Sequence, residues 1–134
     1  MIFSYTRVNS ITPFGKLSTR KVPLVVIDFK GKPSYNCIID SGASISHMHG
    51  DFGRCIGLDI ESGIRLSSKG IPGISFISYI HTIRFKLGIF NCKIDVAFSD
   101  DFKFDVGLLG RERFFDLFKI HFHQRDGYFE IEPY

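Results

Sequence analysis

A short apolar segment that runs into a carboxylate and a turn of small residues is the most constraining feature of this sequence. It reads Cys37-Ile38-Ile39-Asp40-Ser41-Gly42-Ala43-Ser44. Consecutive apolar residues favour a buried strand, and a carboxylate directly after such a strand is costly unless it is paired or neutralised. The position of Asp40 therefore predicts a functional carboxylate, although Asp, Ser and Gly also form ordinary β-turns.

A second apolar segment lies much later in the chain and also ends in glycine. It is Val106-Gly107-Leu108-Leu109-Gly110, followed directly by Arg111. Together the two segments resemble the retropepsin-like aspartic proteases, which carry Asp-Thr/Ser-Gly-Ala in the first third of the chain and apolar-apolar-Gly-Arg near its end. The resemblance covers residues 21–133. It implies that Asp40 is the catalytic aspartate and that Leu108, Leu109, Gly110 and Arg111 support its loop.

The resemblance implies an all-β, retropepsin-like acid protease fold: a closed, barrel-like subunit with one short C-terminal helix followed by a β-hairpin. Composition agrees, because 15 Phe, five Tyr and many Ile and Val favour half-buried strands and 13 Gly supply turns. A chain of 134 residues suits one domain but not two lobes. We therefore expect a single domain over residues 1–134, with residues 1–16 as an arm that crosses to another copy or as a frayed end.

Alternating apolar and polar residues, separated by Gly and Pro, predict the order of the elements. The expected strands span residues 21–30, 34–39, 45–49, 64–69, 74–87 and 89–98. The expected short helices span residues 51–56 and 112–117. Asp51 is the predicted N-cap of the first helix. Residues 118–124 and 128–132 alternate around Asp126-Gly127, which predicts a two-residue hairpin turn.

The sequence holds one Asp-Ser-Gly motif. The most similar tripeptide, Glu61-Ser62-Gly63, lacks an apolar strand before it. If catalysis needs two aspartates, as the resemblance implies, the enzyme is a homodimer with Asp40 of each subunit at a two-fold axis. Two carboxylates at such a short distance would share one proton. One would activate a water that attacks the peptide carbonyl, and the protonated partner would donate to the leaving nitrogen.

The neighbours of Asp40 have roles that the resemblance implies. Ser41, where Thr is commoner, would hydrogen-bond across the two-fold axis, and Gly42 would let the substrate backbone approach closely. Ala43 and Ser44 would complete the loop that binds substrate. A flap around residues 66–80 would close over the peptide, or this segment is an ordinary surface hairpin. The expected flap tip consists of Gly70, Ile71, Pro72, Gly73 and Ile74.

Arg111 has several candidate partners. In retroviral relatives this arginine pairs with an acidic residue shortly after the active-site turn, but this sequence has Ser44 there. Arg111 would instead bond Ser44 and backbone carbonyls, pair with Asp116 or Asp59, or remain solvated.

Two histidine pairs offer a different chemistry. The pairs are His47 with His49, and His121 with His123. Because the members of each pair are two residues apart, they share one face of a strand. The pairs could bind zinc if their strands were neighbours, or they are polar positions on a solvated face. His81 stands alone and is expected to be exposed. The protease resemblance itself implies no metal and no cofactor.

Charge and hydropathy limit the partners. The net charge is +3 and basic residues are interspersed with acidic ones, so we expect no nucleic-acid partner. No segment has the roughly 20 apolar residues that span a bilayer, and no signal peptide is evident, so we expect no membrane association. The three cysteines lack metal-ligand spacing, which favours free, mostly buried thiols in a cytoplasmic protein, or else an intermolecular disulfide.

Two functions from different classes are consistent with these residues. The first is an aspartic endopeptidase acting on a peptide or protein, with apolar pockets flanking the scissile bond. The alternative is a catalytically silent dimer of the same fold that binds peptides as a scaffold module. An intact Asp40 favours the enzyme, because a module without catalysis has no reason to keep a costly carboxylate pair.

Overall fold

The chain folds mainly into β-strands. The computed structural model describes residues 1–69 and 75–134. The strands are β1 (Ile2–Ser4), β2 (Thr6–Ile11), β3 (Leu17–Val22), β4 (Leu24–Ile27), β5 (Tyr35–Ile39), β6 (Ser46–His49), β7 (Ile64–Lys69), β8 (Ser75–Leu87), β9 (Phe90–Ser99), β10 (Gly107–Leu109), β11 (Phe118–His123) and β12 (Tyr128–Pro133). The helical segments are α1 (Gly50–Cys55), η1 (Ile60–Ser62) and η2 (Arg111–Phe115). The all-β class is therefore confirmed.

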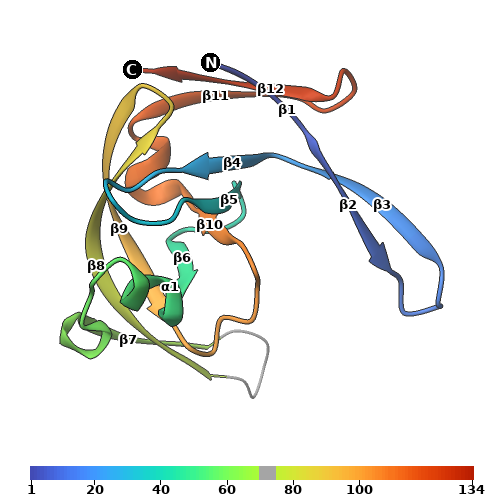
Figure 1. Cartoon of the computed structure of the whole chain (residues 1–134). Helices are drawn as coiled ribbons and strands as arrows, with labels where there is room; N and C mark the ends of the chain where they lie inside the picture. The colour runs from blue at the N-terminus through green and yellow to red at the C-terminus, as the bar shows by residue number, and fades with distance from the viewer. Residues whose placement is uncertain (70–74) are drawn as a thin grey trace.

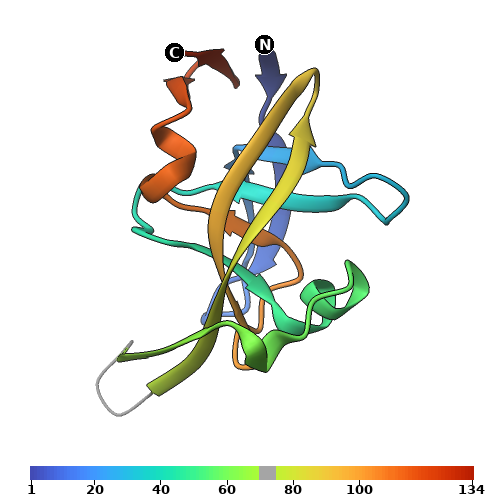
Figure 2. The same ribbon diagram turned by 90° about the vertical axis from the view of Figure 1, so that its left-hand side faces the viewer.

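The main sheet has seven strands in the order β4-β5-β10-β6-β9-β8-β7. The sheet curls so that Asp28, the residue after β4, forms a β-bridge with Lys86 of β8. There the N–H of Asp28 donates to the Lys86 carbonyl at 2.9 Å, and the Lys86 N–H donates to the Asp28 carbonyl at 2.8 Å. Figure 2 shows the long β8–β9 hairpin crossing in front of β4 and β5. This bridge closes the sheet, so the expected barrel-like subunit is confirmed.

Strand alternation places the core inside the barrel. In β4 the side chains of Val25 and Ile27 are buried, whereas that of Val26 is 45% exposed, as the two-residue period of a strand requires. Fully buried side chains also include Phe98 of β9 and Phe129 of β12. Burying one such phenylalanine contributes about 2 kcal/mol. Because both belong to one apolar cluster, the core joins the barrel to the C-terminal hairpin.

Two cysteines are part of this core. Cys37 and Cys92 are buried, Cys55 is exposed, and all three thiols are free. Burial raises the pKa of the Cys37 thiol to about 12 and that of Cys92 to about 11. Both thiols therefore stay protonated and pack as small apolar groups. The expectation of mostly buried thiols is confirmed, whereas an intermolecular disulfide at the exposed Cys55 is not tested by a single chain.

The two chain ends meet in a three-stranded sheet of order β1-β12-β11, here called the terminal sheet. The N-terminal amine of Met1 donates to the Ile131 carbonyl at 2.7 Å, and the Ile131 N–H donates to the Met1 carbonyl at 2.8 Å. The β11–β12 hairpin itself was expected from its alternating pattern. The first and last segments of the chain are thus held together beside the barrel.

The turn of this hairpin is longer than predicted. His123 pairs with Tyr128, so the turn covers residues 124–127. A two-residue type I′ turn at Asp126-Gly127 would need positive φ at both residues. Only Gly127 in this turn has a positive φ, of 83°. The predicted two-residue turn is therefore wrong.

The N-terminal region differs most from the expectation. Pro23, which has no N–H for a strand ladder, divides the predicted strand 21–30 between β3 and β4. Within residues 1–16, β1 joins the terminal sheet and β2 pairs with β3. Figure 1 shows the β2–β3 hairpin standing away from the rest of the chain. That it crosses to another copy stays a prediction.

The helical segments are short and partly irregular. α1 is capped by His49, whose Nδ1 accepts a hydrogen bond from the Asp51 N–H at 3.0 Å, so Asp51 is not the N-cap. The predicted helix 112–117 is a single turn, η2, interrupted at Arg113 with a φ of 69°. None of the helices in the described part of the chain is long and apolar enough to cross a membrane.

Candidate active site

The two apolar segments singled out in the sequence lie side by side in the barrel. β5 and β10 pair in parallel, with residues 37–39 opposite residues 107–109, so that Leu108 faces Ile38 across the ladder. The Asp40 N–H donates to the Leu109 carbonyl at 3.0 Å. Leu109 is fully buried. The backbone of Asp40 is therefore tied to the core at the point where β5 ends.

Residues 40–44, here called the Asp40 loop, form a tight turn that orients the carboxylate. The Gly42 N–H donates to Asp40 Oδ1 at 2.9 Å, and the Ala43 N–H donates to the Asp40 carbonyl at 3.2 Å. A Cβ on Gly42 would lie 3.1 Å from Asp40 Oδ1, so glycine lets the turn close tightly. Asp40 is half-buried, while Ser41, Gly42 and Ser44 are exposed. The loop thus holds an accessible carboxylate in one orientation.

Gly110 packs directly behind this loop. A Cβ on Gly110 would lie 2.6 Å from the Ile45 backbone and 3.0 Å from the Ala43 carbonyl oxygen. Its N–H donates to the Ser46 hydroxyl at 3.0 Å. Ser46 is fully buried and was not among the predicted site residues. The signal that could have found it is a serine on the same strand face as the buried Met48, where a polar side chain needs a hydrogen-bond partner.

Arg111 binds the loop through both its backbone and its side chain. Its N–H donates to the Ala43 carbonyl at 2.9 Å, and its guanidinium donates to the Ser41 carbonyl at 3.1 Å. Of the partners considered for Arg111, loop carbonyls are therefore the ones it contacts. Among the described residues it makes no ion pair with Asp116 or Asp59.

Arg111→Met is expected to lower the free energy of unfolding by about 1 kcal/mol, because one charge-assisted hydrogen bond is lost at an exposed position. Urea denaturation of both proteins measures the difference. Arg125→Met, which removes an exposed arginine in the β11–β12 turn, is the control and should leave stability unchanged. Equal losses in the two variants would mean that Arg111 acts only as a surface charge.

The predicted flap tip lies outside the described residues. Its members are Gly70, Ile71, Pro72, Gly73 and Ile74. The strands on either side, β7 and β8, pair antiparallel from Ile64 with Ile80 to Lys69 with Ser75. β7 forms an edge of the main sheet. A flap over residues 66–80 therefore stays a prediction.

The two histidine pairs do not form a joint zinc site. His47 and His49 lie on β6 in the main sheet, whereas His121 and His123 lie on β11 in the terminal sheet. Because these strands are not neighbours, the zinc alternative is wrong. His47 stacks on Phe102, and burial lowers its pKa. His81 was expected to be exposed but is half-buried, and its ring Nε2 lies 2.8 Å from the Ile60 carbonyl oxygen.

A charge cluster that was not predicted surrounds Arg54 of α1. The Arg54 guanidinium donates to both carboxylate oxygens of Asp100, at 2.8 and 3.0 Å, and to Asp51 at 3.1 Å. Ligand atoms of His49, Asp51 and Asp100 lie within 4.8 Å of one another, but both carboxylates already accept hydrogen bonds from Arg54. The cluster therefore fastens α1 to the end of β9. Arg54 and Asp100 are 46 residues apart in the sequence, so no local pattern indicates their pairing.

The stability supplied by this cluster is expected to depend on pH. The hydrogen bond from Arg54 holds the pKa of Asp100 below its ordinary value. Such a carboxyl contributes stability above its unfolded pKa of about 3.9, and the contribution is lost as the pH falls through the folded pKa. Wild type should therefore be more stable than Asp100→Asn at pH 6, with the difference shrinking toward pH 3.

Urea unfolding at pH 6 and pH 3 measures how far the stability difference between wild type and Asp100→Asn shrinks. Asp126→Asn, in the exposed β11–β12 turn, is the matched control and should show none. A difference between wild type and Asp100→Asn that stays constant from pH 6 to pH 3 would contradict the prediction.

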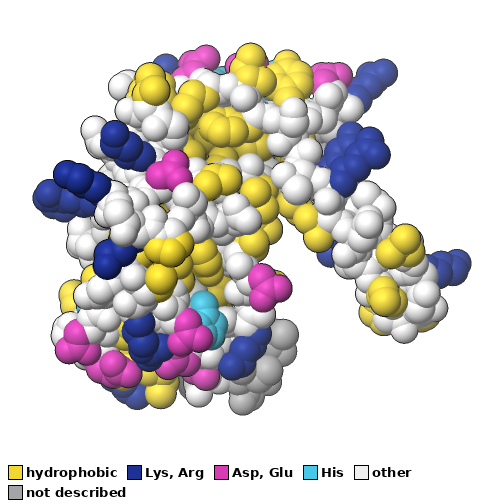
Figure 3. Space-filling view, viewed as in Figure 1, with side chains coloured by type: hydrophobic (Ala, Val, Ile, Leu, Met, Phe, Trp, Pro, Cys, Tyr) yellow, Lys and Arg dark blue, Asp and Glu magenta, His cyan; other side chains and the backbone are white. Residues whose placement is uncertain are grey.

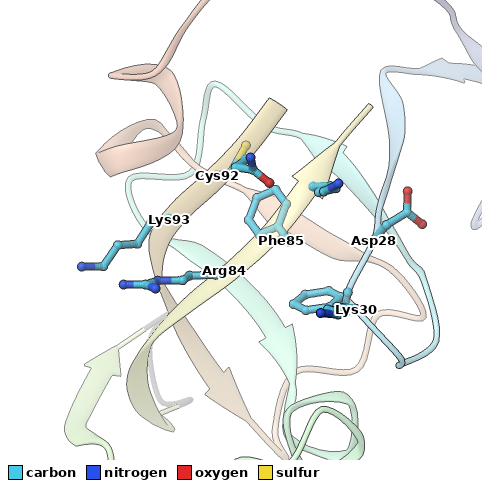
Figure 4. A pocket seen from close by; sticks show the side chains of 9 residues that line it. Asp28, Lys30, Arg84, Phe85, Cys92 and Lys93 are labelled. Atoms are coloured by element: carbon cyan, nitrogen blue, oxygen red, sulfur yellow. The ribbon is translucent and has the colours of Figure 1, made fainter. Parts of the chain in front are cut away.

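Neither of two hollows on the described surface is lined by the Asp40 loop. The larger, of about 900 Å³, lies between the β8–β9 hairpin and the residues that follow β4. Its lining includes four basic residues and one acidic residue, Asp28, beside Phe29 and Phe85. Figure 4 shows Arg84 and Lys93 extending to the same side. They are directly opposed on β8 and β9, where like charges repel. The smaller hollow, of about 380 Å³, lies beside α1.

Comparison with known proteins supports the fold. No protein-family model matches the sequence, and no curated protein does. Among solved structures, the chain is similar to a foamy viral protease-reverse transcriptase in complex with an RNA/DNA hybrid, at 17% identity and a TM-score of 0.50. The match covers 67% of this chain and 11% of the viral chain, so this chain spans a small part of the viral protein's length. At this identity the likeness is one of fold, to a protein that contains a protease.

Proposed function

We propose that residues 1–134 form a single domain that is one half of a homodimeric aspartic endopeptidase. The observation that best supports this is the construction of the Asp40 loop. Its carboxylate is oriented by the Gly42 N–H at 2.9 Å, and the Arg111 guanidinium binds the same loop from 70 residues away along the chain. A turn that only joined β5 to β6 would not need this second set of bonds. The likeness of the fold to a protease-containing viral protein supports the same function.

In the proposed dimer, Asp40 of each copy faces the other across a two-fold axis. Two carboxylates in hydrogen-bonding contact do not both ionise, so they hold one proton between them. The ionised carboxylate takes a proton from a bound water, whose oxygen attacks the carbonyl carbon of the peptide bond. The protonated carboxylate polarises the carbonyl oxygen. Breakdown of the tetrahedral intermediate then breaks the C–N bond as a proton passes to the leaving nitrogen.

The other residues of the loop position the substrate and the second subunit. Gly42, which is exposed, leaves room for the peptide backbone and offers its carbonyl as an acceptor. The Ser41 hydroxyl hydrogen-bonds across the two-fold axis. Ala43 and Ser44 complete the substrate-binding surface, and the Arg111 N–H holds the Ala43 carbonyl at 2.9 Å. The segment over residues 66–80 closes on the peptide as a flap.

The proposed substrate is a peptide or protein with apolar side chains on both sides of the scissile bond, met in the cytoplasm. The reaction needs no metal or organic cofactor, because the two carboxylates carry out both proton transfers. Neither nucleic acid nor membrane takes part in the proposed reaction.

Incubation of the purified protein with a diverse peptide pool, at several pH values and with mass-spectrometric detection, tests this function. We expect cleavage between apolar residues, and a statine-type inhibitor should suppress it because its hydroxyl takes the place of the attacking water. Peptides that bind without being cut would instead support the scaffold module considered from the sequence.

A further inference from the structure

The hairpin of β2 and β3, with its turn at residues 12–16, is here called the arm. Within the described chain β2 and β3 pair with each other and with no other strand. Figure 1 shows them projecting from the barrel. A two-stranded hairpin alone in water is marginally stable at best. The arm therefore calls for a further surface against which to pack.

The tip of the arm is apolar and exposed. Ile11 at the end of β2 and Leu17 at the start of β3 are cross-strand neighbours, and their side chains are 77% and 72% exposed. Phe14, in the turn between them, is 89% exposed. Figure 3 shows hydrophobic side chains at the outer end of the arm, next to basic ones. Large apolar side chains grouped at this exposure mark a contact surface.

The arm also differs from the rest of the chain in charge. Residues 1–27 hold Arg7, Lys16, Arg20 and Lys21 and no acidic residue. The remaining 13 basic and 14 acidic residues give the rest of the chain a net charge of −1. The arm of one copy and the body of another therefore carry net charges of opposite sign, as complementary surfaces do.

The root of the arm lies beside the Asp40 loop. β4 and β5 are antiparallel, with Leu24 opposite Ile38, so the start of β4 is next to the end of β5. The Ile39 N–H, one residue before Asp40, donates to the Pro23 carbonyl at 2.9 Å. A second copy that brings its own Asp40 to this loop is thus adjacent to the arm. The arm is long enough to reach along that copy, because six-residue strands extend about 20 Å.

We propose that the arm is a clasp for a second copy of this chain, with Ile11, Phe14 and Leu17 of each protomer packed against the body of its partner. This inference rests on the proposed function, because contact between the two Asp40 loops is what places the partner beside the arm. The reciprocal exchange of two arms buries both apolar tips and sets the basic strands beside the less basic body of the partner. The clasp tightens the dimer without contributing a reacting group.

Photo-crosslinking from the tip identifies what covers the arm. Phe14 is replaced by benzoylphenylalanine in ¹⁵N-labelled chains, which are mixed with unlabelled wild type and irradiated. We expect crosslinked peptides that join a labelled arm to an unlabelled body. Crosslinks confined to the labelled chain, or none at all, would overturn the clasp.

Sedimentation velocity over a concentration series measures what the tip contributes to association. Ile11→Ser/Phe14→Ser/Leu17→Ser should raise the dimer dissociation constant at least tenfold. Because all three side chains lie outside the buried core, the barrel should stay folded, and a cooperative urea unfolding transition checks this. Ile89→Ser, which removes an 83% exposed isoleucine from the β8–β9 turn, is the matched control and should dimerise like wild type. A triple variant that dimerises like wild type would refute the clasp.

Peptide cleavage in the same samples separates the clasp from the proposed function. If both hold, the triple variant loses activity at low protein concentration and regains it at high concentration. A wild-type dimer that cuts nothing, but whose arm variant dissociates, supports the clasp and refutes the protease. A wild-type chain that stays monomeric refutes the clasp. Binding of both proteins to vesicles of anionic phospholipid is measured as well, and a triple variant that loses only this binding also refutes the clasp.

Discussion

Asp40→Asn is expected to lower the rate of peptide cleavage by a factor on the order of 10³ or more, because both proton-transfer roles fall to this one carboxylate and its copy. Asparagine keeps the size of the side chain and can still accept the hydrogen bond from the Gly42 N–H. Folding and dimerisation should therefore persist in circular dichroism and sedimentation. Asp126→Asn, in the exposed β11–β12 turn, serves as the control with full activity.

A mixing experiment with the same variant tests whether the site is shared between subunits. At a fixed amount of wild-type chain, an equal amount of Asp40→Asn chain should lower cleavage to about half, because half of the wild-type chains then lie in mixed dimers that lack one aspartate. Subunits that each held a complete site would show no loss on mixing. Loss of cleavage in Asp40→Asn alone, without this mixing effect, would leave Asp40 essential but place the whole site within one subunit.

Gly110→Ala is expected to lower the free energy of unfolding by about 3 kcal/mol, at the upper end of what overpacking usually costs. The added Cβ would lie 2.6 Å from the backbone of Ile45 and 3.0 Å from the Ala43 carbonyl oxygen. Backbone atoms cannot turn aside as a side chain can, so the Asp40 loop itself must shift. Urea denaturation measures the stability, and the proposed cleavage should fall with it even at temperatures where the variant stays folded.

Gly57→Ala provides the comparison for this steric effect. No heavy atom lies within 4 Å of a Cβ built on Gly57, but its φ is +94°. That change should therefore cost only the backbone strain of the left-handed region, about 1 kcal/mol. Activity should be normal, because Gly57 follows α1 and is not part of the Asp40 loop. Similar losses of activity in both alanine variants would argue against a specific role of Gly110 behind the loop.

The parts of the structure that could be predicted are those whose cause is local or whose pattern resembles a family. Val25 and Ile27 alternate with Val26 as a half-buried strand requires. The adjacency of Asp40 and Leu109 was expected from the resemblance rather than from any spacing, and the parallel pairing of β5 with β10 bears it out. The Arg111 contact with a loop carbonyl was one of several alternatives that the sequence left open.

What could not be predicted depends on contacts between distant segments or on competing local acceptors. The bond from Gly110 to the Ser46 hydroxyl spans 64 residues, and no periodicity indicates it. α1 begins at Gly50, one residue before the predicted N-cap, so Asp51 lies inside the first turn and its N–H donates to the His49 cap. An arm over residues 1–16 was one expectation, but the β2–β3 hairpin was not predicted, because Thr12-Pro13-Phe14-Gly15 breaks the alternation. The same residues lie in the turn that joins β2 to β3.

The dependence of the Asp40 loop on residues 109–111 has a consequence for biosynthesis. Asp40 is synthesised well before its partners. The Leu109 carbonyl, which accepts a hydrogen bond from the Asp40 N–H, and Arg111, which donates to the Ser41 carbonyl, follow about 70 residues later. A nascent polypeptide on the ribosome therefore carries Asp40 before residues 109–111 are present to hold its loop. Under the proposed function, cleavage by this site has to await the synthesis of residues 109–111 and their folding onto the Asp40 loop.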